Sequence, residues 1–278
     1  MTDDKYSWRL LCLELLAVAI ALVILAPFYF VLINSVKSFA AILTETAAWP
    51  REFVWDNYLR AWDVMNYPVA FMNSLIITVA AITGIVILAA MAAYRMVRHP
   101  SLLNKLLFSL FVSAMVIPFQ SIMIPLMKVT SQLGMLNSRW GLVCAYFGFG
   151  VSLAIFLFHG FIKSVPREIE ESGVVDGCSP YGVFWRIVFP LLQPMIATVV
   201  ILNALWIWND FLLPFLMVNS SPSLRTIPLS TFALFGEYTK QWDLAMAALV
   251  MGVAPIIIFF LALQRRIIEG ITAGSVKG

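Results

Sequence analysis

One short polar stretch of this strongly apolar chain carries four carboxylates. They are Glu168, Glu170, Glu171 and Asp176, and they lie within the segment 166–194. Carboxylates at this density can form charge-assisted hydrogen bonds with basic groups of another protein. They can also stabilise the positive end of a helix, a role that accounts for one or two acids but not for the whole segment. We therefore predict that this segment is a docking surface for a protein partner.

A second group of residues combines hydrogen-bonding and aromatic side chains inside apolar runs. Its members are Gln120, Asn203, Trp206, Trp208, Asn209 and Asp210. Polar side chains at membrane depth are candidates for a transport pathway. Aromatic faces beside hydrogen-bonding groups suit sugars, which present both apolar faces and hydroxyls. Two structural alternatives stay open: Asp210 could cap or solvate a helix end, and the kink expected between Pro118 and Pro125 could serve packing.

The composition predicts that these residues lie in a membrane protein. Hydrophobic residues make up 62% of the 278 residues and charged residues 12%, against about 25% charged residues in soluble domains. Several apolar runs can cross a hydrocarbon core of about 30 Å, and they must be helices because isolated strands would leave backbone groups unpaired in lipid. Six spans are expected: Leu10–Ile33, Val69–Met91, Leu106–Met127, Gly141–Phe161, Leu191–Leu213 and Leu244–Leu263.

The expected fold class is all-α, a polytopic membrane protein with six transmembrane helices. We expect one transmembrane domain over residues 1–278, with a cytoplasmic two-helix coupling loop at 162–190. An even number of spans puts both termini on one side, together with the acidic loop. That side carries 11 of the Lys and Arg residues and the opposite side carries 7. The positive-inside rule therefore places both termini and the acidic loop in the cytoplasm.

The acidic loop itself predicts two short helices. Ser164 can cap a first helix that begins near Pro166, because Pro is tolerated in a first helical turn. Asp176-Gly177 is a turn signal, and Ser179-Pro180 then starts a second helix. The apolar stripe of this second helix is expected to be Tyr181, Phe184, Trp185 and Val188. Two short helices joined at a sharp turn would form a compact knob that fits a groove on a soluble partner.

Several functions are excluded by what the sequence lacks. It contains no G-x-x-x-x-G-K-[ST] motif to cradle ATP, and neither H-E-x-x-H nor G-x-S-x-G. No catalytic residue is therefore assigned. His99 and His159 have no neighbouring ligands in the sequence, so no metal is assigned, and a net charge of +3 is too small to indicate nucleic acid. The main alternative is a secondary, ion-coupled transporter, which usually needs ionisable groups near the midplane.

The acidic loop resembles the EAA loop of permease subunits of binding-protein-dependent ABC importers. The family pattern is Glu-Ala-Ala, three residues, then Gly, and later Pro. Here Glu171-Ser172-Gly173 is followed by three residues, then by Gly177, with Pro190 beyond. Ser-Gly in place of Ala-Ala is a departure that could soften the helix, since Gly costs up to about 1 kcal/mol relative to Ala. Other segments are similar to carbohydrate-uptake permeases related to the maltose permease MalG: 118–125, 133–137, 208–214 and 270–278.

The resemblance implies a subunit of a sugar importer in the bacterial inner membrane. Its expected partners are a second permease, an ATPase dimer, an extracytoplasmic sugar-binding protein and the lipid membrane, but no nucleic acid. The chain would bind no cofactor, since Mg-ATP would belong to the ATPase. The residues expected to couple to the ATPase are Glu168, Glu171, Asp176, Gly177 and Pro190, and the tail residues Gly274 and Lys277 would approach it. The identity of the sugar stays open.

Overall fold

The computed structural model describes residues 8–235 and 241–275, with side chains described as far as residue 262. Within these ranges every regular element is a helix, which confirms the all-α class. Four helices are long and apolar enough to span a membrane, and two bent helix pairs raise the number to as many as six. The four are α1 (Trp8–Asn34), α4 (Tyr67–Arg98), α7 (Arg139–Ile162) and α14 (Trp242–Ser275). The two pairs are α5 (Leu102–Ala114) with α6 (Phe119–Gln132), and Pro180–Leu191 with α11 (Gln193–Asn209).

The third predicted span is a pair of helices and not one continuous helix. The sequence predicts a kink between Pro118 and Pro125, but the helix breaks before α6, and α5 and α6 meet at an angle of 107°. Pro118 adopts an extended conformation (φ −64°, ψ 137°) at the N-cap of α6. Proline has no backbone N–H and disfavours the helical conformation in the residue before it, so the chain turns here. Pro125 lies inside α6 and does not end it.

Residue contacts divide the chain into two compact units, which we describe separately. The first contains Met1–Tyr67 and Ser230–Val253, and the second contains Pro68–Leu229 and Ala254–Gly278. The assignment of residues 1–278 to one transmembrane domain stays a prediction.

Buried hydrogen bonds organise the first unit around Asn57. The Asn57 Nδ2 group donates to the carbonyls of Ser35 (3.0 Å) and Lys37 (2.8 Å), and this side chain is 1% exposed. The Lys37 Nζ group in turn donates to the carbonyls of Glu45 (2.8 Å) and Thr46 (3.2 Å). Burial lowers the pKa of Lys37, and the nearby Glu45 charge opposes that shift. These bonds hold the end of α1 against the helices that follow it, α2 (Phe39–Thr44) and α3 (Asp56–Val64).

The second unit is built around α7, whose apolar face is the most enclosed of the candidate spans. Two glycines let α4 approach α7 closely. A Cβ atom on Gly84 would collide with the Phe147 ring, and one on Gly150 would collide with Ile85. The helices α5, α11 and α12 (Leu212–Val218) also contact α7. Close packing of this kind positions α11, which carries most of the residues predicted along a transport pathway, and α4, whose C-terminal end contacts the acidic loop.

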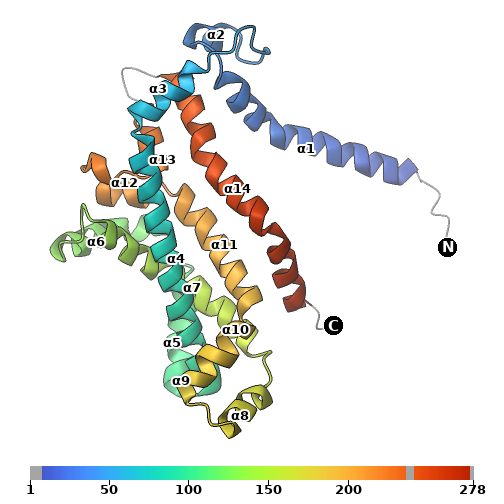
Figure 1. Cartoon of the computed structure of the whole chain (residues 1–278), viewed down its shortest axis with the longest axis vertical. Coiled ribbons are helices and arrows are strands. Elements are labelled where there is room, and N and C mark those ends of the chain that lie inside the picture. Colours follow the sequence, from blue (N-terminus) through green and yellow to red (C-terminus); the bar gives the residue numbers. More distant parts are fainter. Residues whose placement is uncertain (1–7, 236–240, 276–278) are drawn as a thin grey trace. The chain divides into compact units, whose positions relative to one another are not determined.

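Polar contacts fix both ends of α4 within this second unit. At its N-terminal end, Asn73 Nδ2 donates to the carbonyls of Ser223 (2.9 Å) and Arg225 (3.0 Å). Ser74 Oγ accepts from the backbone N–H of Ile227 (2.9 Å), which anchors the loop before α13 (Ile227–Phe232). The short elements α8, α9 and α10 gather at the C-terminal end of α4 (Figure 1). They are α8 (Arg167–Val175), α9 (Pro180–Val183), a π-helical turn η1 (Phe184–Val188) and α10 (Phe189–Leu191).

We expect Asn57→Ala to lower the free energy of unfolding by about 1–3 kcal/mol, since two buried carbonyls would lose their donor. The change should appear as a lower thermal midpoint of the purified chain in detergent. Asp63→Ala is the matched control, because Asp63 is an exposed polar residue on the same helix. Equal midpoints for the two variants would contradict the assignment of Asn57 as the centre of this unit.

Candidate functional site

The first helix of the acidic loop, α8, begins where the sequence predicted but with a different cap. Pro166 is the N-cap residue and no side chain caps the helix. The Ser164 hydroxyl donates to the Phe161 carbonyl (2.8 Å), so the predicted Ser164 cap is wrong. The hydroxyl instead satisfies a carbonyl in the last turn of α7, an alternative that Ser side chains often take. Glu168 and Glu170 lie in the first turn of α8, at the positive end of its dipole.

The turn between the two short helices has the geometry that requires glycine. Gly177 has φ +85°, in the left-handed region. The Cys178 N–H donates to the Gly173 carbonyl (2.9 Å) and the Gly177 N–H to the Val174 carbonyl (3.0 Å). These two bonds make a Schellman motif that ends α8 after its C-cap residue, Asp176. The predicted tight turn at Gly177 is therefore present, and Asp176 lies exposed on its surface.

The second short helix starts at its predicted cap and then widens. Ser179 Oγ accepts from the Gly182 N–H (3.2 Å), as expected for an N-cap. The π-helical turn that follows is closed by a bond from the Phe189 N–H to the Phe184 carbonyl. It precedes Pro190, which cannot donate a backbone bond and lies exposed in the first turn of α10. The predicted stripe is only half right, because Phe184 and Val188 are buried whereas Tyr181 and Trp185 are exposed.

The four carboxylates point in different directions, and Glu170 is the buried one. Glu170 is 9% exposed, whereas Glu168, Glu171 and Asp176 are exposed. Glu170 Oε2 accepts from the Tyr94 hydroxyl (2.8 Å), and Oε1 accepts from Arg98 Nε (2.7 Å) and pairs with the other arm of the guanidinium. Sequence reasoning missed Tyr94 and Arg98. Their signal was a tyrosine and an arginine four residues apart at the end of a span, which share one helix face.

The outward face of the two helices combines acids with exposed apolar side chains. Val175 is 86% exposed, Tyr181 is 75% exposed, and Val174 is exposed beside them. We call these three residues, together with Glu168 and Glu171, the docking surface. A neighbouring cavity of about 520 Å³ is lined by Glu171, Val174 and Val175 and by basic groups that include Arg167 and His99. Exposed apolar groups rimmed by charges are typical of a protein interaction site.

Packing explains why glycine stands at position 173, where the Glu-Ala-Ala pattern has alanine. A Cβ atom on Gly173 would collide with Ile187 Cδ1 and come near Val183, both on the second helical segment. The missing methyl group at Gly173 thus makes room for the longer side chain of Ile187. This contact holds α8 against η1, and it offsets the low helix propensity of glycine.

The residues expected along a transport pathway fall into separate places. Asp210 ends α11, where Oδ2 accepts from the Tyr146 hydroxyl of α7 (2.9 Å) and Oδ1 accepts from the Leu212 N–H (3.0 Å). Trp206 packs edge-on against the same Tyr146 ring, with 5.5 Å between ring centroids. The structure therefore brings Asp210, Trp206 and Tyr146 together. Tyr146 was not predicted, although a tyrosine in an apolar run needs a partner for its hydroxyl.

The other pathway residues lie apart from this trio. Trp208 is buried against Phe71 and lines an apolar cavity of about 420 Å³ between α4, α11 and α14. Asn203 is buried, and its Nδ2 group donates to the Val199 carbonyl of its own helix (2.9 Å). Asn209 and Gln120 are exposed, and Gln120 lies in the first turn of α6.

The predicted tail residues lie at or beyond the end of the described chain. Gly274 lies in the last turn of α14, and Lys277 lies outside the described residues. Among the described side chains, no three of the types His, Cys, Asp and Glu gather as a metal site.

This architecture matches a known class of membrane protein. Residues 85–272 match the family described as binding-protein-dependent transport system inner membrane component, and the chain belongs to that family. It is 42% identical over 265 residues to the probable starch degradation products transport system permease protein AmyC of Thermoanaerobacterium thermosulfurigenes, covering 95% of this chain and 96% of that protein. It is 35% identical to the multiple sugar-binding transport system permease protein MsmG of Streptococcus mutans, covering 98% of each.

A solved structure supports the same fold. It is that of a bacterial ABC transporter involved in the import of the acidic polysaccharide alginate. The TM-score is 0.79 and the sequence identity is 20%, and the match covers 95% of this chain and 99% of that one. The family model thus identifies the chain as an inner-membrane component of a transport system, and the solved structure shows the same fold.

We expect Gly177→Ala to destabilise the turn by about 1–2 kcal/mol, the cost of a left-handed conformation for a residue with a Cβ atom. No atom lies within 4 Å of the added Cβ, so the effect should come from the backbone alone. Amide hydrogen exchange over residues 167–178 should accelerate by about 5- to 30-fold. Gly160→Ala, a helical position that is equally open, serves as the control. Unchanged exchange in Gly177→Ala would refute the strained-turn assignment.

Proposed function

We propose that this chain is a transmembrane subunit of an ATP-driven importer. Together with a second, related permease it forms an alternating-access pathway, and an ATPase dimer docks on its cytoplasmic loop. The observation that carries this proposal is the docking surface, in which Glu171, Val175 and Tyr181 are all exposed. A carboxylate set among apolar groups suits a groove that offers a basic side chain with apolar walls.

The chain supplies movement and not catalysis in this proposal. Mg-ATP binds to the ATPase subunits, because this sequence lacks a phosphate-cradling loop. Closure of the ATPase dimer displaces α8, and the permease pair then exposes its pathway to the opposite side of the membrane. The positive-inside bias and an even number of spans support a cytoplasmic position for α8 and for both termini.

The cargo we propose is a carbohydrate delivered by an extracytoplasmic binding protein. The names of both relatives refer to sugars or starch products, and the solved transporter is involved in polysaccharide import. Within the chain, the Tyr146–Asp210–Trp206 trio combines an aromatic face with hydroxyl and carboxylate groups, which is chemistry suited to a sugar. Trp208, Asn203, Asn209 and Gln120 remain proposed pathway residues on the strength of the sequence.

Glu171→Lys should release the ATPase from this chain. Reversing an exposed charge of the docking surface places like charges opposite each other, and we expect about a tenfold or greater loss of co-purified ATPase, equivalent to about 1.4 kcal/mol. The measurement is affinity purification of the tagged chain after co-expression with its second permease and ATPase. Glu52→Lys is the matched control, because Glu52 is an exposed acid far along the chain from α8.

Two results would contradict the proposal. One is full retention of the ATPase by Glu171→Lys. The other is sugar uptake by this chain alone in proteoliposomes without any ATPase, which would indicate an ion-coupled transporter instead.

A further inference from the structure

The Arg98 side chain joins three segments at the cytoplasmic end of α4. It extends from α4 itself, and its guanidinium bonds Glu170 of α8 through Nε (2.7 Å). The same guanidinium donates through its NH2 nitrogen to the Val165 carbonyl (2.9 Å), in the linker between α7 and α8. The pair is largely withdrawn from water, with 10% of the Arg98 side chain and 12% of the Glu170 side chain exposed. A planar guanidinium with several bonds fixes the orientation of its partners as well as their distance.

Tyr94, one turn before Arg98, strengthens the same connection. Its hydroxyl donates to Glu170 Oε2 (2.8 Å). Its ring packs against Phe184 of η1, with 5.3 Å between centroids. Residues four apart lie on one helix face, so a single face of α4 holds both α8 and the segment after it. We call Tyr94, Arg98 and Glu170 the latch.

A buried ion pair is a poor way to gain stability but a good way to fix one arrangement. Removing two charges from water largely cancels their attraction, and apolar packing of similar volume often stabilises as much. The latch supplies directional bonds between α8 and α4, and these bonds prevent α8 from sliding along α4. The backbone connects α8 directly to α7 but not to α4. Without the latch, no hydrogen bond or ion pair found among the described residues would join α8 to α4.

We propose that Glu170 and Arg98 are positioning residues that transmit movement of the docking helix α8 to the membrane helix α4. This inference rests on the proposed function, since it takes the ATPase as the source of movement. It assigns different tasks to two adjacent carboxylates: Glu171 faces the ATPase, and Glu170 faces inward and couples α8 to α4. Among the membrane helices, α4 is then driven through side chains, although it is distant from α8 in the sequence.

The test uses the assembled transporter, purified with its second permease and ATPase, and a non-hydrolysable Mg-ATP analogue as the probe. Hydrogen exchange is followed in two segments, residues 167–177 of α8 and residues 89–98 of α4. In the unaltered protein both segments should respond to the analogue. In Arg98→Gln the response of α8 should persist, while that of α4 should fall by about fivefold or more, within the usual range of coupling between sites.

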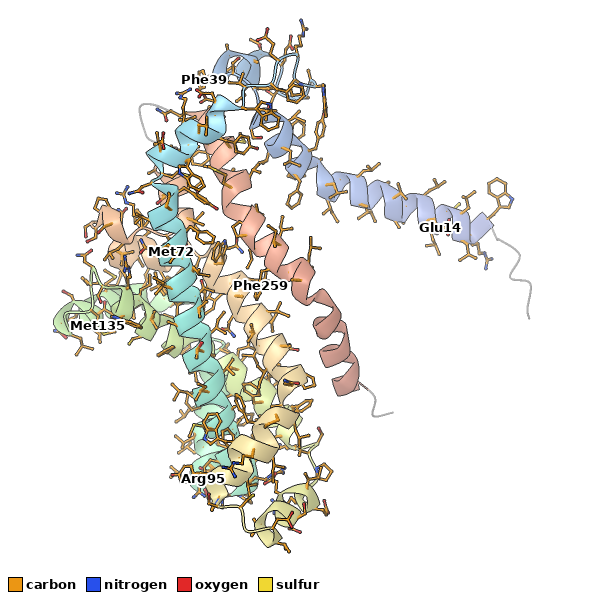
Figure 2. The ribbon with its side chains drawn as sticks, in the orientation of Figure 1. Glu14, Phe39, Met72, Arg95, Met135 and Phe259 are labelled. Atoms are coloured by element: carbon orange, nitrogen blue, oxygen red, sulfur yellow. The ribbon has the colours of Figure 1, made fainter. Side chains whose placement is uncertain are left out.

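Arg95→Gln is the matched control, because it removes the same charge from the same end of α4. Arg95 is exposed and lies outside the latch, and Figure 2 labels it near the C-terminal end of α4. It should leave both responses unchanged. Arg98→Lys, which keeps the charge but loses the planar fork, should restore the α4 response only in part. A merely structural role would not separate the two responses in this way.

The outcomes are distinguishable. Equal responses of α4 in Arg98→Gln and in the unaltered protein would overturn the inference and leave the proposed function standing. No response of α8 in the unaltered protein would overturn the proposed docking, and this inference with it. If Arg98→Gln does not assemble, Arg98→Lys decides, because it keeps the charge and loses the planar fork. A full α4 response in Arg98→Lys would then refute the proposed role of Arg98.

Discussion

The arrangement of the acidic loop depends on one buried carboxylate. Glu170 cannot be taken out of water without compensation, and Tyr94 and Arg98 of α4 provide it. Because successive residues of a helix point about 100° apart, burying Glu170 also determines what the rest of α8 exposes. Glu171 and Val175 then face outward, and Gly173 faces the second helix, where the lack of a side chain admits Ile187. This charge pair thus sets the orientation of α8 and of the docking-surface residues on it.

The membrane portion shows the same division between fixed and accessible polar groups. Asp210 accepts hydrogen bonds from the Tyr146 hydroxyl of α7 and from the Leu212 N–H in the first turn of α12, so both of its carboxylate oxygens are paired. Asn203 serves the contact between α11 and α7, close to Gly150. Polar groups inside an apolar chain are therefore mostly paired here, as low dielectric surroundings demand. A sugar passing this region would contact polar side chains that are mostly held already by hydrogen bonds within the chain.

The features that the sequence predicts correctly are those determined by residues close together in the chain. The apolar runs indicated the spans, the Asp176-Gly177 pair indicated the turn, and Ser179 indicated the second helix, because each signal acts within a few residues. The failures involve choices that depend on distant groups or on geometry. The Ser164 hydroxyl has two local choices, the first turn of α8 and the last turn of α7. It donates to the Phe161 carbonyl of α7. Pro118 indicates a break but does not by itself set the angle of 107°. The partners of Glu170 on α4 lie more than seventy residues away in the sequence, which no local pattern contains.

The account predicts above all that the exposed tip of α8 touches the ATPase. A photo-activated cross-linking residue in place of Val175 tests this most directly in the assembled transporter. Val116 is the matched position, since it is similarly exposed (79% against 86%) but lies at the break between α5 and α6. The account predicts a covalent adduct with the ATPase from position 175 and none from position 116. Absence of an adduct from position 175, or an equal yield from both positions, would contradict it.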